Sequence, residues 1–262
     1  MLSYRHVFHA GNHADVLKHL VQVLILQYLV KKEGKALRYI DTHAGAGGYD
    51  LRSANARKNR EFDSGIARLW QRADLPPPLE SYLTILRSVN PAGQLVHYPG
   101  SPTIAAQILH ASHRLDLFEL HPDDAKRLAR WAQQDRRIKV EQGDGFAALK
   151  AILPPIEKRA LVMIDPPYEI KTDYTTVVSA LQQAIRKFTT GVYALWYPLL
   201  ERESVSALVK KLEALPVKSL LVELPVQAAA LEGMYGSGMF IINPPWILRE
   251  SLESCLPYLH NV

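Results

Sequence analysis

Residues 161–168 form an apolar run that ends in an acid, two prolines and an aromatic residue. The Asp165 carboxylate and the Pro166 carbonyl could accept the hydrogens of an exocyclic amino group. Such acceptors favour attack by the nitrogen, because its lone pair is otherwise delocalised into the ring. The prolines fix the backbone that carries the acceptors, and Tyr168 could stack on a base taken out of its helix. The pattern predicts transfer to an amino nitrogen, with a rigid strand-end turn as the alternative.

A second copy of this pattern, Asn243-Pro244-Pro245-Trp246, also follows an apolar segment. Its Asn could act as an amide version of the acid. Order along the chain separates the two copies, because Asp165 follows the fourth strand that we predict and Asn243 follows the last strand of a predicted hairpin. We therefore place the chemistry at Asp165 and expect a structural turn at Asn243, with a catalytic role there as the alternative.

A glycine-rich turn, residues 42–48, follows a short apolar strand. Glycines such as Gly45 and Gly47 let a backbone approach a nucleotide-like ligand at the end of a strand. A dinucleotide fingerprint would place its third glycine where this chain has Asp50. The turn therefore favours S-adenosylmethionine (SAM) over a nicotinamide cofactor, and a purely structural turn is the remaining alternative.

Two further acids follow predicted strands. Glu119 ends an apolar strand, where an acid commonly binds the two hydroxyls of a ribose, and Asp144 stands between glycines in a tight turn that could hold an adenine amino group. A solvated strand-end Glu and a plain turn Asp are the structural alternatives.

Histidines near the start of the chain raise the question of zinc. No cysteine or compact carboxylate set accompanies them, so we expect no metal and favour substrate-contacting or helix-face roles. His19 and His43 could lie near the cofactor, while Tyr4 and Arg5 could meet RNA. The four early histidines are His6, His9, His13 and His19.

Alternating strand and helix patterns predict the elements that hold these residues. One long amphipathic helix follows Asn12, with Gly34 as its terminator, and residues 49–100 look like a helical insertion with helices near 62–72 and 79–89. Strands are predicted at 37–41, 114–119, 138–141, 160–164, 191–196, 217–224 and 238–243, and helices at 123–134, 145–152, 174–188, 203–214 and 247–256. The last two strands leave no room for a helix between them. We predict an α/β fold with a seven-stranded doubly wound sheet and a C-terminal antiparallel hairpin.

Composition limits the class of protein. The chain has 262 residues, a formal net charge of +5 and a single cysteine, Cys255. One cysteine excludes an intrachain disulfide, and a reducing cytoplasmic location fits. The positive charge favours a polyanionic partner. We expect no membrane span and no obligate protein partner.

Taken together, the motifs resemble the RlmJ-type family of 23S ribosomal RNA adenine-N6 methyltransferases, whose members have also been labelled DNA-utilisation proteins. The resemblance covers almost the whole chain and implies a Rossmann-like SAM-dependent methyltransferase fold, with residues 1–48 and 101–262 as the methyltransferase domain and 49–100 as a helical insertion. The matching segments are residues 4–6, 9–19, 41–47, 98–102, 119–122, 144–146, 165–168 and 243–246.

Carried over to this chain, the resemblance implies SAM as cofactor and 23S ribosomal RNA as partner. It implies cofactor contacts for His19, His43, Ser101, Glu119, Asp144 and Gly145, beside Gly45 and Gly47 of the turn. Asp165 would be the catalytic acceptor and Tyr4 a substrate-side residue. From the residues themselves we add Pro166 and Tyr168 to the catalytic set, and Arg5 and Lys18 to the substrate side. DNA adenine-N6 methylation, or nucleic-acid binding without catalysis, are the alternative functions.

Overall fold

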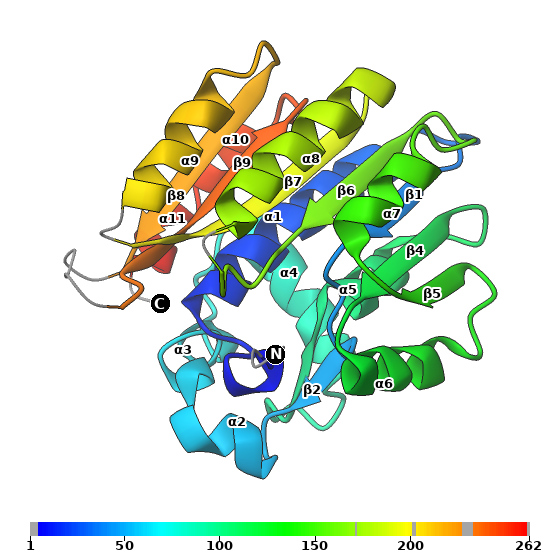
Figure 1. Ribbon diagram of the computed structural model, residues 1–262. Coiled ribbons are helices and arrows are strands. Elements are labelled where there is room, and N and C mark those ends of the chain that lie inside the picture. Colours follow the sequence, from blue (N-terminus) through cyan, green and yellow to red (C-terminus); the bar gives the residue numbers. More distant parts are fainter. Residues whose placement is uncertain (1–4, 171, 201–202, 227–232, 261–262) are drawn as a thin grey trace.

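The computed structural model describes residues 5–170, 172–200, 203–226 and 233–260, and its centre is a seven-stranded sheet (Figure 1). The strand order is β5-β4-β1-β6-β7-β9-β8. Neighbouring strands from β5 to β7 are parallel, and β9 lies antiparallel between β7 and β8. The strands are β1 (Arg38–Asp41), β4 (Arg114–Glu119), β5 (Ile138–Gln142), β6 (Ala160–Ile164), β7 (Val192–Leu199), β8 (Ser219–Pro225) and β9 (Gly236–Ile242). The predicted doubly wound sheet and its C-terminal hairpin are confirmed.

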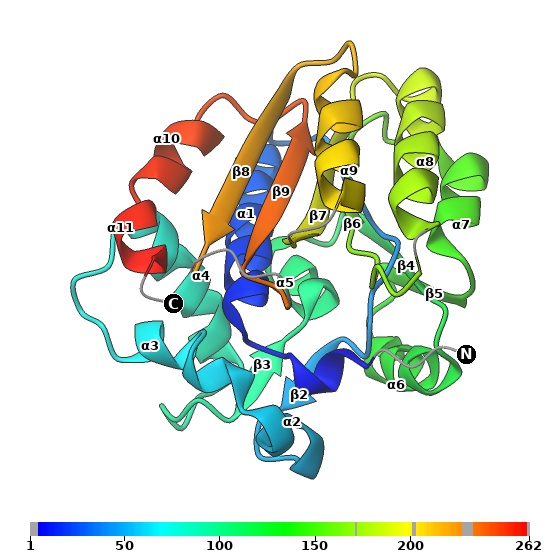
Figure 2. The same ribbon diagram turned by 60° about the vertical axis from the view of Figure 1, so that its left-hand side comes forward.

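Both faces of the sheet are covered by helices, as Figure 1 and Figure 2 show from two sides. All five residues of β6 are buried, and alternate residues belong to different cores: Leu161 to one and Val162 to the other. This is the expected pattern for a parallel strand with helices on both sides. The core that includes Leu161 receives α1 (His13–Val30), α4 (Pro77–Ser88), α5 (Ser101–Ile108), α6 (Pro122–Ala132), α10 (Leu248–Glu253) and α11 (Leu256–Leu259), and the other core receives α7 (Gly145–Ile152), α8 (Asp173–Lys187) and α9 (Glu203–Glu213).

Helix α1 confirms the predicted long helix and ends at Val30, before Gly34. Asn12 caps it by accepting a hydrogen bond from the Asp15 backbone N–H, which satisfies an otherwise free donor. Contacts with α4, α5 and β9 enclose the helix, and its residues 14–26 are buried. Polar side chains in its first two turns are therefore held inside the protein. Within the described residues, no helix is long and apolar enough to cross a membrane.

Residues 49–100 hold α2 (Ala54–Asn59), α3 (Ala67–Trp70) and α4. Two short strands that we did not predict, β2 (Gly48–Asp50) and β3 (His97–Pro99), pair antiparallel and bring the ends of this segment together. The expected helix at 62–72 is wrong in its first half, because Gly65 is packed against the chain at Gly11: a Cβ on Gly65 would lie 2.1 Å from the Gly11 oxygen. The Ile66 N–H also donates to that oxygen at 2.9 Å. The segment therefore holds a short 3-10 helix, Glu61–Asp63, and α3 in place of one continuous helix.

Candidate active site

Four parallel strands end at one edge of the sheet, around a cavity of about 420 Å³. Ligands of doubly wound sheets bind beyond the carboxyl ends of the strands, so residues that follow β1, β4, β5 and β6 come together here. The predicted site residues that line this cavity are Lys18, His19, His43, Gly45, Ser101, Glu119, Asp144, Gly145, Asp165 and Pro166.

Three other predicted site residues that the structure describes do not line it. Gly47 lies behind the turn, against α6. Tyr168 lines a second, adjoining cavity. The Arg5 guanidinium lies 3.4 Å from the Asp124 carboxylate at the edge of the site. Tyr4 lies outside the described residues, so its predicted role stays a prediction.

The glycine turn fixes an acid at the cavity wall. Gly45 has φ +62°, a conformation that glycine adopts without strain, and a Cβ there would lie 2.4 Å from the Tyr49 hydroxyl. Its N–H donates to Glu119 Oε2 at 2.7 Å, and the His121 N–H donates to Glu119 Oε1 at 2.7 Å. Burial raises the pKa of Glu119 above its ordinary value. The turn and the second long strand thus hold this carboxylate in place together.

Helix α7 begins directly beside the glycine turn. A Cβ on Gly145 would lie 2.1 Å from the Thr42 carbonyl oxygen, so glycine is what permits this close packing. Asp144 caps the helix, accepting from the Phe146 N–H at 2.8 Å. The Phe146 ring meets the His43 ring edge-on, with 5.0 Å between centroids. An acid and an aromatic surface therefore lie next to each other at this wall.

Sequence reasoning gave Asp41 no role, although the residue stands in the strand-to-glycine motif. The structure buries its carboxylate, which accepts from Ser101 Oγ and the Tyr39 hydroxyl at 2.7 Å each and from the His43 N–H at 3.2 Å. Burial raises the pKa of Asp41 to about 6. Ser101, which only the resemblance had implied, is thereby tied to the glycine turn.

Two histidines of the cavity wall are neutral near pH 7. His19 is buried and shares a hydrogen bond of 2.8 Å with the Tyr98 hydroxyl, and burial lowers its pKa to about 3. Burial likewise lowers the pKa of His43 to about 4. Both rings offer hydrogen-bonding groups and flat surfaces to a ligand rather than positive charge.

Two of the four early histidines lie beside carboxylates. His6 Nε2 lies 2.9 Å from Asp15 Oδ2, and His9 Nδ1 lies 2.8 Å from Glu61 Oε1. In the part of the chain that the structure describes, no three metal-binding side chains converge.

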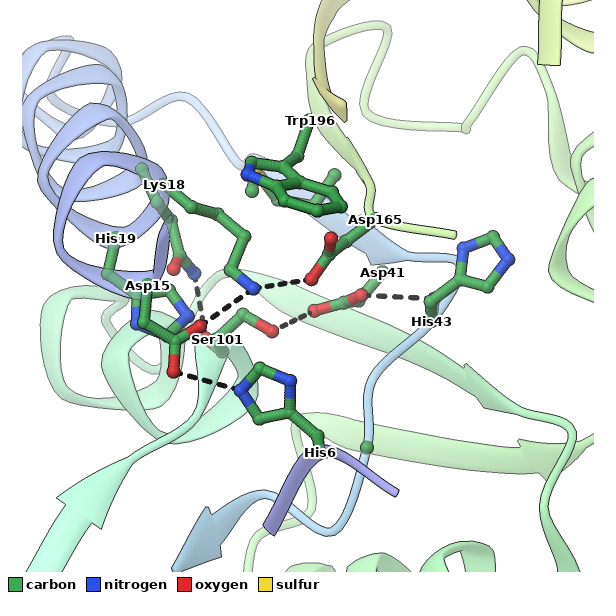
Figure 3. A network of polar contacts seen from close by, with 12 residues as sticks. His6, Asp15, Lys18, His19, Asp41, His43, Ser101, Asp165 and Trp196 are labelled. Atoms are coloured by element: carbon green, nitrogen blue, oxygen red, sulfur yellow. Dashed lines mark hydrogen bonds and ion pairs between the residues drawn. The ribbon is translucent and has the colours of Figure 1, made fainter. Parts of the chain in front are cut away.

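Asp165 stands where the two cavities meet, since it lines both of them. Figure 3 shows its carboxylate facing the Lys18 ammonium, 2.5 Å from Nζ to Oδ2. On its other side, Lys18 Nζ lies 2.8 Å from Asp15 Oδ1. Burial alone would lower the pKa of Lys18, but attraction to Asp15 first and to Asp165 next raises it above the ordinary value. The lysine therefore keeps its charge between two carboxylates.

The second cavity, about 230 Å³, has aromatic walls. Tyr168 adopts a left-handed φ of 51°, and its hydroxyl donates to the Trp196 carbonyl at 3.0 Å. Ring centroids lie 4.7 Å apart for Tyr168 and Tyr174, and 6.1 Å apart for Tyr168 and Trp196. Three rings thus surround a space beside Asp165.

Trp196 is a site residue that sequence reasoning missed. The register pairs Ile164 of β6 with Leu195 of β7, which brings the following residues, Asp165 and Trp196, to the same edge. The tryptophan ends a strand predicted at 191–196, so only the strand alignment could have indicated its place.

Fold and site together define a SAM-dependent methyltransferase of the Rossmann-like class. The glycine turn follows the first strand of the sheet, the fixed Glu119 follows its neighbour, and Asp165 follows the strand on the other side. A cavity of about 420 Å³ lies within the usual range for ligand pockets, roughly 300–1,000 Å³.

Comparisons with known proteins assign the family. The profile of the family described as Ribosomal RNA large subunit methyltransferase D, RlmJ, matches residues 34–262, and the chain belongs to this family. Its members are SAM-dependent methyltransferases of ribosomal RNA, so the predicted family, enzyme class and cofactor are confirmed.

Full-length similarity supports the same conclusion. Ribosomal RNA large subunit methyltransferase J of Escherichia coli K12 is 50% identical over 263 residues, covering 100% of this chain and 94% of the relative. The protein of the same name from Haemophilus influenzae is 46% identical, covering 99% and 93%. A crystal structure of a Legionella pneumophila protein superposes with a TM-score of 0.90 at 37% identity, covering 96% of this chain and 92% of that one.

Proposed function

We propose that this methyltransferase transfers the methyl group of SAM to the N6 amino group of an adenine in 23S ribosomal RNA. The observation that carries the proposal is the position of Asp165 and Pro166, which line both the larger cavity and the aromatic one. An amino group entering from the aromatic cavity would meet these acceptors at the boundary with the cofactor cavity.

The larger cavity fits SAM by the chemistry of its walls. Glu119 would accept the ribose hydroxyls, Asp144 the adenine amino group, and the rings of Phe146 and His43 would contact the adenine. Gly45 and Ser101 would also contact the cofactor in this cavity. When bound, the cofactor supplies a methyl group made electrophilic by the sulfonium.

The aromatic cavity would hold the target adenine. Enzymes that modify a base take it out of its stack, and stacking on Tyr168 or Trp196 would offset part of that cost, at roughly 1–3 kcal/mol for each base. Tyr174 closes the same space behind Tyr168. Three fixed rings suit a flat heterocycle better than a flexible chain.

At the boundary, the Asp165 carboxylate and the Pro166 carbonyl would each accept one hydrogen of the amino group. This would turn the nitrogen lone pair away from the acceptors and toward the cofactor cavity, so alignment supplies the main catalytic effect. The reaction needs no metal ligand from these residues. Lys18, now hydrogen-bonded to Asp165, would have to share this carboxylate with the substrate.

RNA is favoured over DNA by the family, and 23S RNA by the resemblance of the motifs. The net charge of +5 suits a polyanion. Lys18, Arg5 and Tyr4 are proposed on the substrate side. The cytoplasm, where thiols such as Cys255 stay reduced, is the proposed location.

We also propose that residues 49–100 form an insertion in a methyltransferase domain made of 1–48 and 101–262. The pairing of β2 with β3, which joins the two ends of the inserted segment, supports this division. An insertion of this size adds no separate recognition domain of the kind that a sequence-specific DNA enzyme would need.

The test is transfer of radiolabelled methyl from SAM to protein-free 23S ribosomal RNA and to duplex DNA in parallel, followed by nucleoside analysis. We expect N6-methyladenosine from RNA alone. Label in DNA alone would replace the proposal by DNA adenine methylation. SAM binding without transfer to either polymer would instead favour a non-catalytic nucleic-acid-binding protein.

A further inference from the structure

Asp15 is a fully buried carboxylate beside the site, and no step described above uses it. It lies in the first turn of α1 and accepts a hydrogen bond from the Gly11 N–H at 2.8 Å. His6 Nε2 lies 2.9 Å from its Oδ2, and Lys18 Nζ lies 2.8 Å from its Oδ1. A buried charge is costly unless paired, so this arrangement has to be maintained by its partners.

One ammonium is thus shared between two carboxylates, as Figure 3 shows. The Lys18 side chain is 5% exposed and also lies 5.9 Å from the centre of the Trp196 ring. The Asp165 side chain is 20% exposed and lines both cavities, whereas the Asp15 side chain is 0% exposed and lies only at the wall of the second cavity, beside Lys18. The two acids are therefore unequal: a ligand can reach Asp165, and Lys18 separates Asp15 from it.

We propose that Asp15 is a positioning residue, which holds the Lys18 ammonium beside Asp165 and keeps it paired when the target amino group takes up the Asp165 carboxylate. This rests on the proposed function, because it assigns Asp165 to the amino group. Asp15 itself touches neither cofactor nor substrate and acts through Lys18.

The physical reason is a competition for one carboxylate. If Asp165 were the only partner of Lys18, every arriving amino group would have to displace a buried ion pair and leave the ammonium without an anion. With Asp15 in place, the lysine can loosen its contact to Asp165 and remain paired. Asp15 thereby lowers the free-energy cost of replacing the Lys18 ammonium by the target amino group at the Asp165 carboxylate.

The experiment compares the full-length wild type, Asp15→Asn, Lys18→Met and the double variant. Turnover on 23S RNA, KM for RNA, SAM affinity by calorimetry and Tm are measured for each. Asn keeps the shape of Asp15 and removes its charge. We expect Asp15→Asn to lower kcat by about 10- to 100-fold, the scale seen for small misplacements at an active site, with SAM affinity unchanged. In the Lys18→Met background, Asp15→Asn should change kcat no further, because residues that act through one another are not additive.

A second readout needs no lysine variant. The titratable groups that interact with Lys18 are Asp15, Asp165, His19 and Tyr82, and His6 interacts with Asp15. Asp15 exerts the larger of the two attractions that raise the lysine pKa, so the kcat of Asp15→Asn should fall off at a lower alkaline pH than that of the wild type. A role in folding alone would leave the shape of this pH profile unchanged.

The matched control is Asp116→Asn, which neutralises another buried acid, 2.9 Å from Arg38 and on β4 away from the cavities. It should leave kcat and the pH profile unaltered. Equal losses of kcat from Asp15→Asn in both lysine backgrounds, with an unshifted pH profile, would overturn the positioning role. A wild type that methylates RNA together with an equally active Asp15→Asn would refute this inference alone, whereas an inactive wild type would refute the proposed function.

Discussion

Two turns with the same sequence pattern lie at opposite edges of the sheet. Asp165-Pro166-Pro167-Tyr168 follows β6, at the edge where the parallel strands end. Asn243-Pro244-Pro245-Trp246 follows β9, which runs antiparallel, and the pairing of Ile242 with Tyr193 puts it at the amino end of β7. The aromatic residue that closes each turn differs as well: Tyr168 is 8% exposed and Trp246 is 75% exposed.

The first residue of each turn shows why only one is suited to catalysis. Asn243 has a left-handed φ of 53°, and its Nδ2 donates to the carbonyls of Thr189 and Gly191 at 2.8 Å each. Its side chain therefore stabilises the turn through these two hydrogen bonds. Asp165 instead directs its carboxylate into a cavity, toward Lys18. The role of the motif therefore depends on strand direction, which decides whether the acid meets a ligand or its own chain.

The largest expected effect separates the two turns directly. Asp165→Ala removes the proposed acceptor of the amino group and should lower methyl transfer by about 10²–10⁴-fold, the range for a proton-handling side chain, while SAM binding should largely survive. Asn243→Ala should leave kcat unaltered. Radiolabel transfer and SAM calorimetry on both variants check this. Parallel loss of transfer and SAM binding in Asp165→Ala would argue against the role assigned to it.

The second-largest effect is expected in kcat/KM for RNA and compares two tryptophans, one at each of these edges. Trp196→Ala removes one wall of the aromatic cavity, where we propose that the target base stacks. Loss of roughly 1–3 kcal/mol of stacking predicts a 5- to 150-fold lower kcat/KM for RNA. Trp246→Ala, an exposed tryptophan at the other edge, is the matched control. Steady-state kinetics with varied RNA give both values. If the two substitutions had equal effects, the target base would not bind in the aromatic cavity.

Sequence patterns predicted the seven strands and the edge at which the site lies, because buried parallel strands read as apolar runs and their ends carry the polar motifs. Such patterns could not predict which residues far apart in the sequence form hydrogen bonds with one another. The Asp41 bond to Ser101 joins residues 60 positions apart, and the Lys18 bond to Asp165 spans 147. The strands β2 and β3, three residues each, are too short to show a period.

A smaller effect should appear in stability at Asn243. Asn243→Ala removes two hydrogen bonds. It also leaves alanine in a left-handed conformation, which alanine adopts less readily than asparagine. The free energy of unfolding should therefore fall by about 1–3 kcal/mol. Urea unfolding measures it. Asn243→Gly separates the causes, because glycine tolerates this φ but makes neither bond. Full stability of the glycine variant would show that the hydrogen bonds contribute nothing.

The last expected effect is on stability in acid. Buried titratable groups gather at the Asp165 edge, and His19 is neutral there with its pKa lowered to about 3 by burial. Between the ordinary value of 6.5 and about 3, the unfolded chain binds a proton that the folded chain does not. This histidine therefore lowers stability as pH falls below 6.5, by up to about 1.4 kcal/mol for each pH unit. His19→Gln should flatten that dependence in urea unfolding between pH 7 and 4, whereas substitution of the exposed His260 should not. An unchanged slope in His19→Gln would mean that the acid sensitivity of the fold does not arise at His19.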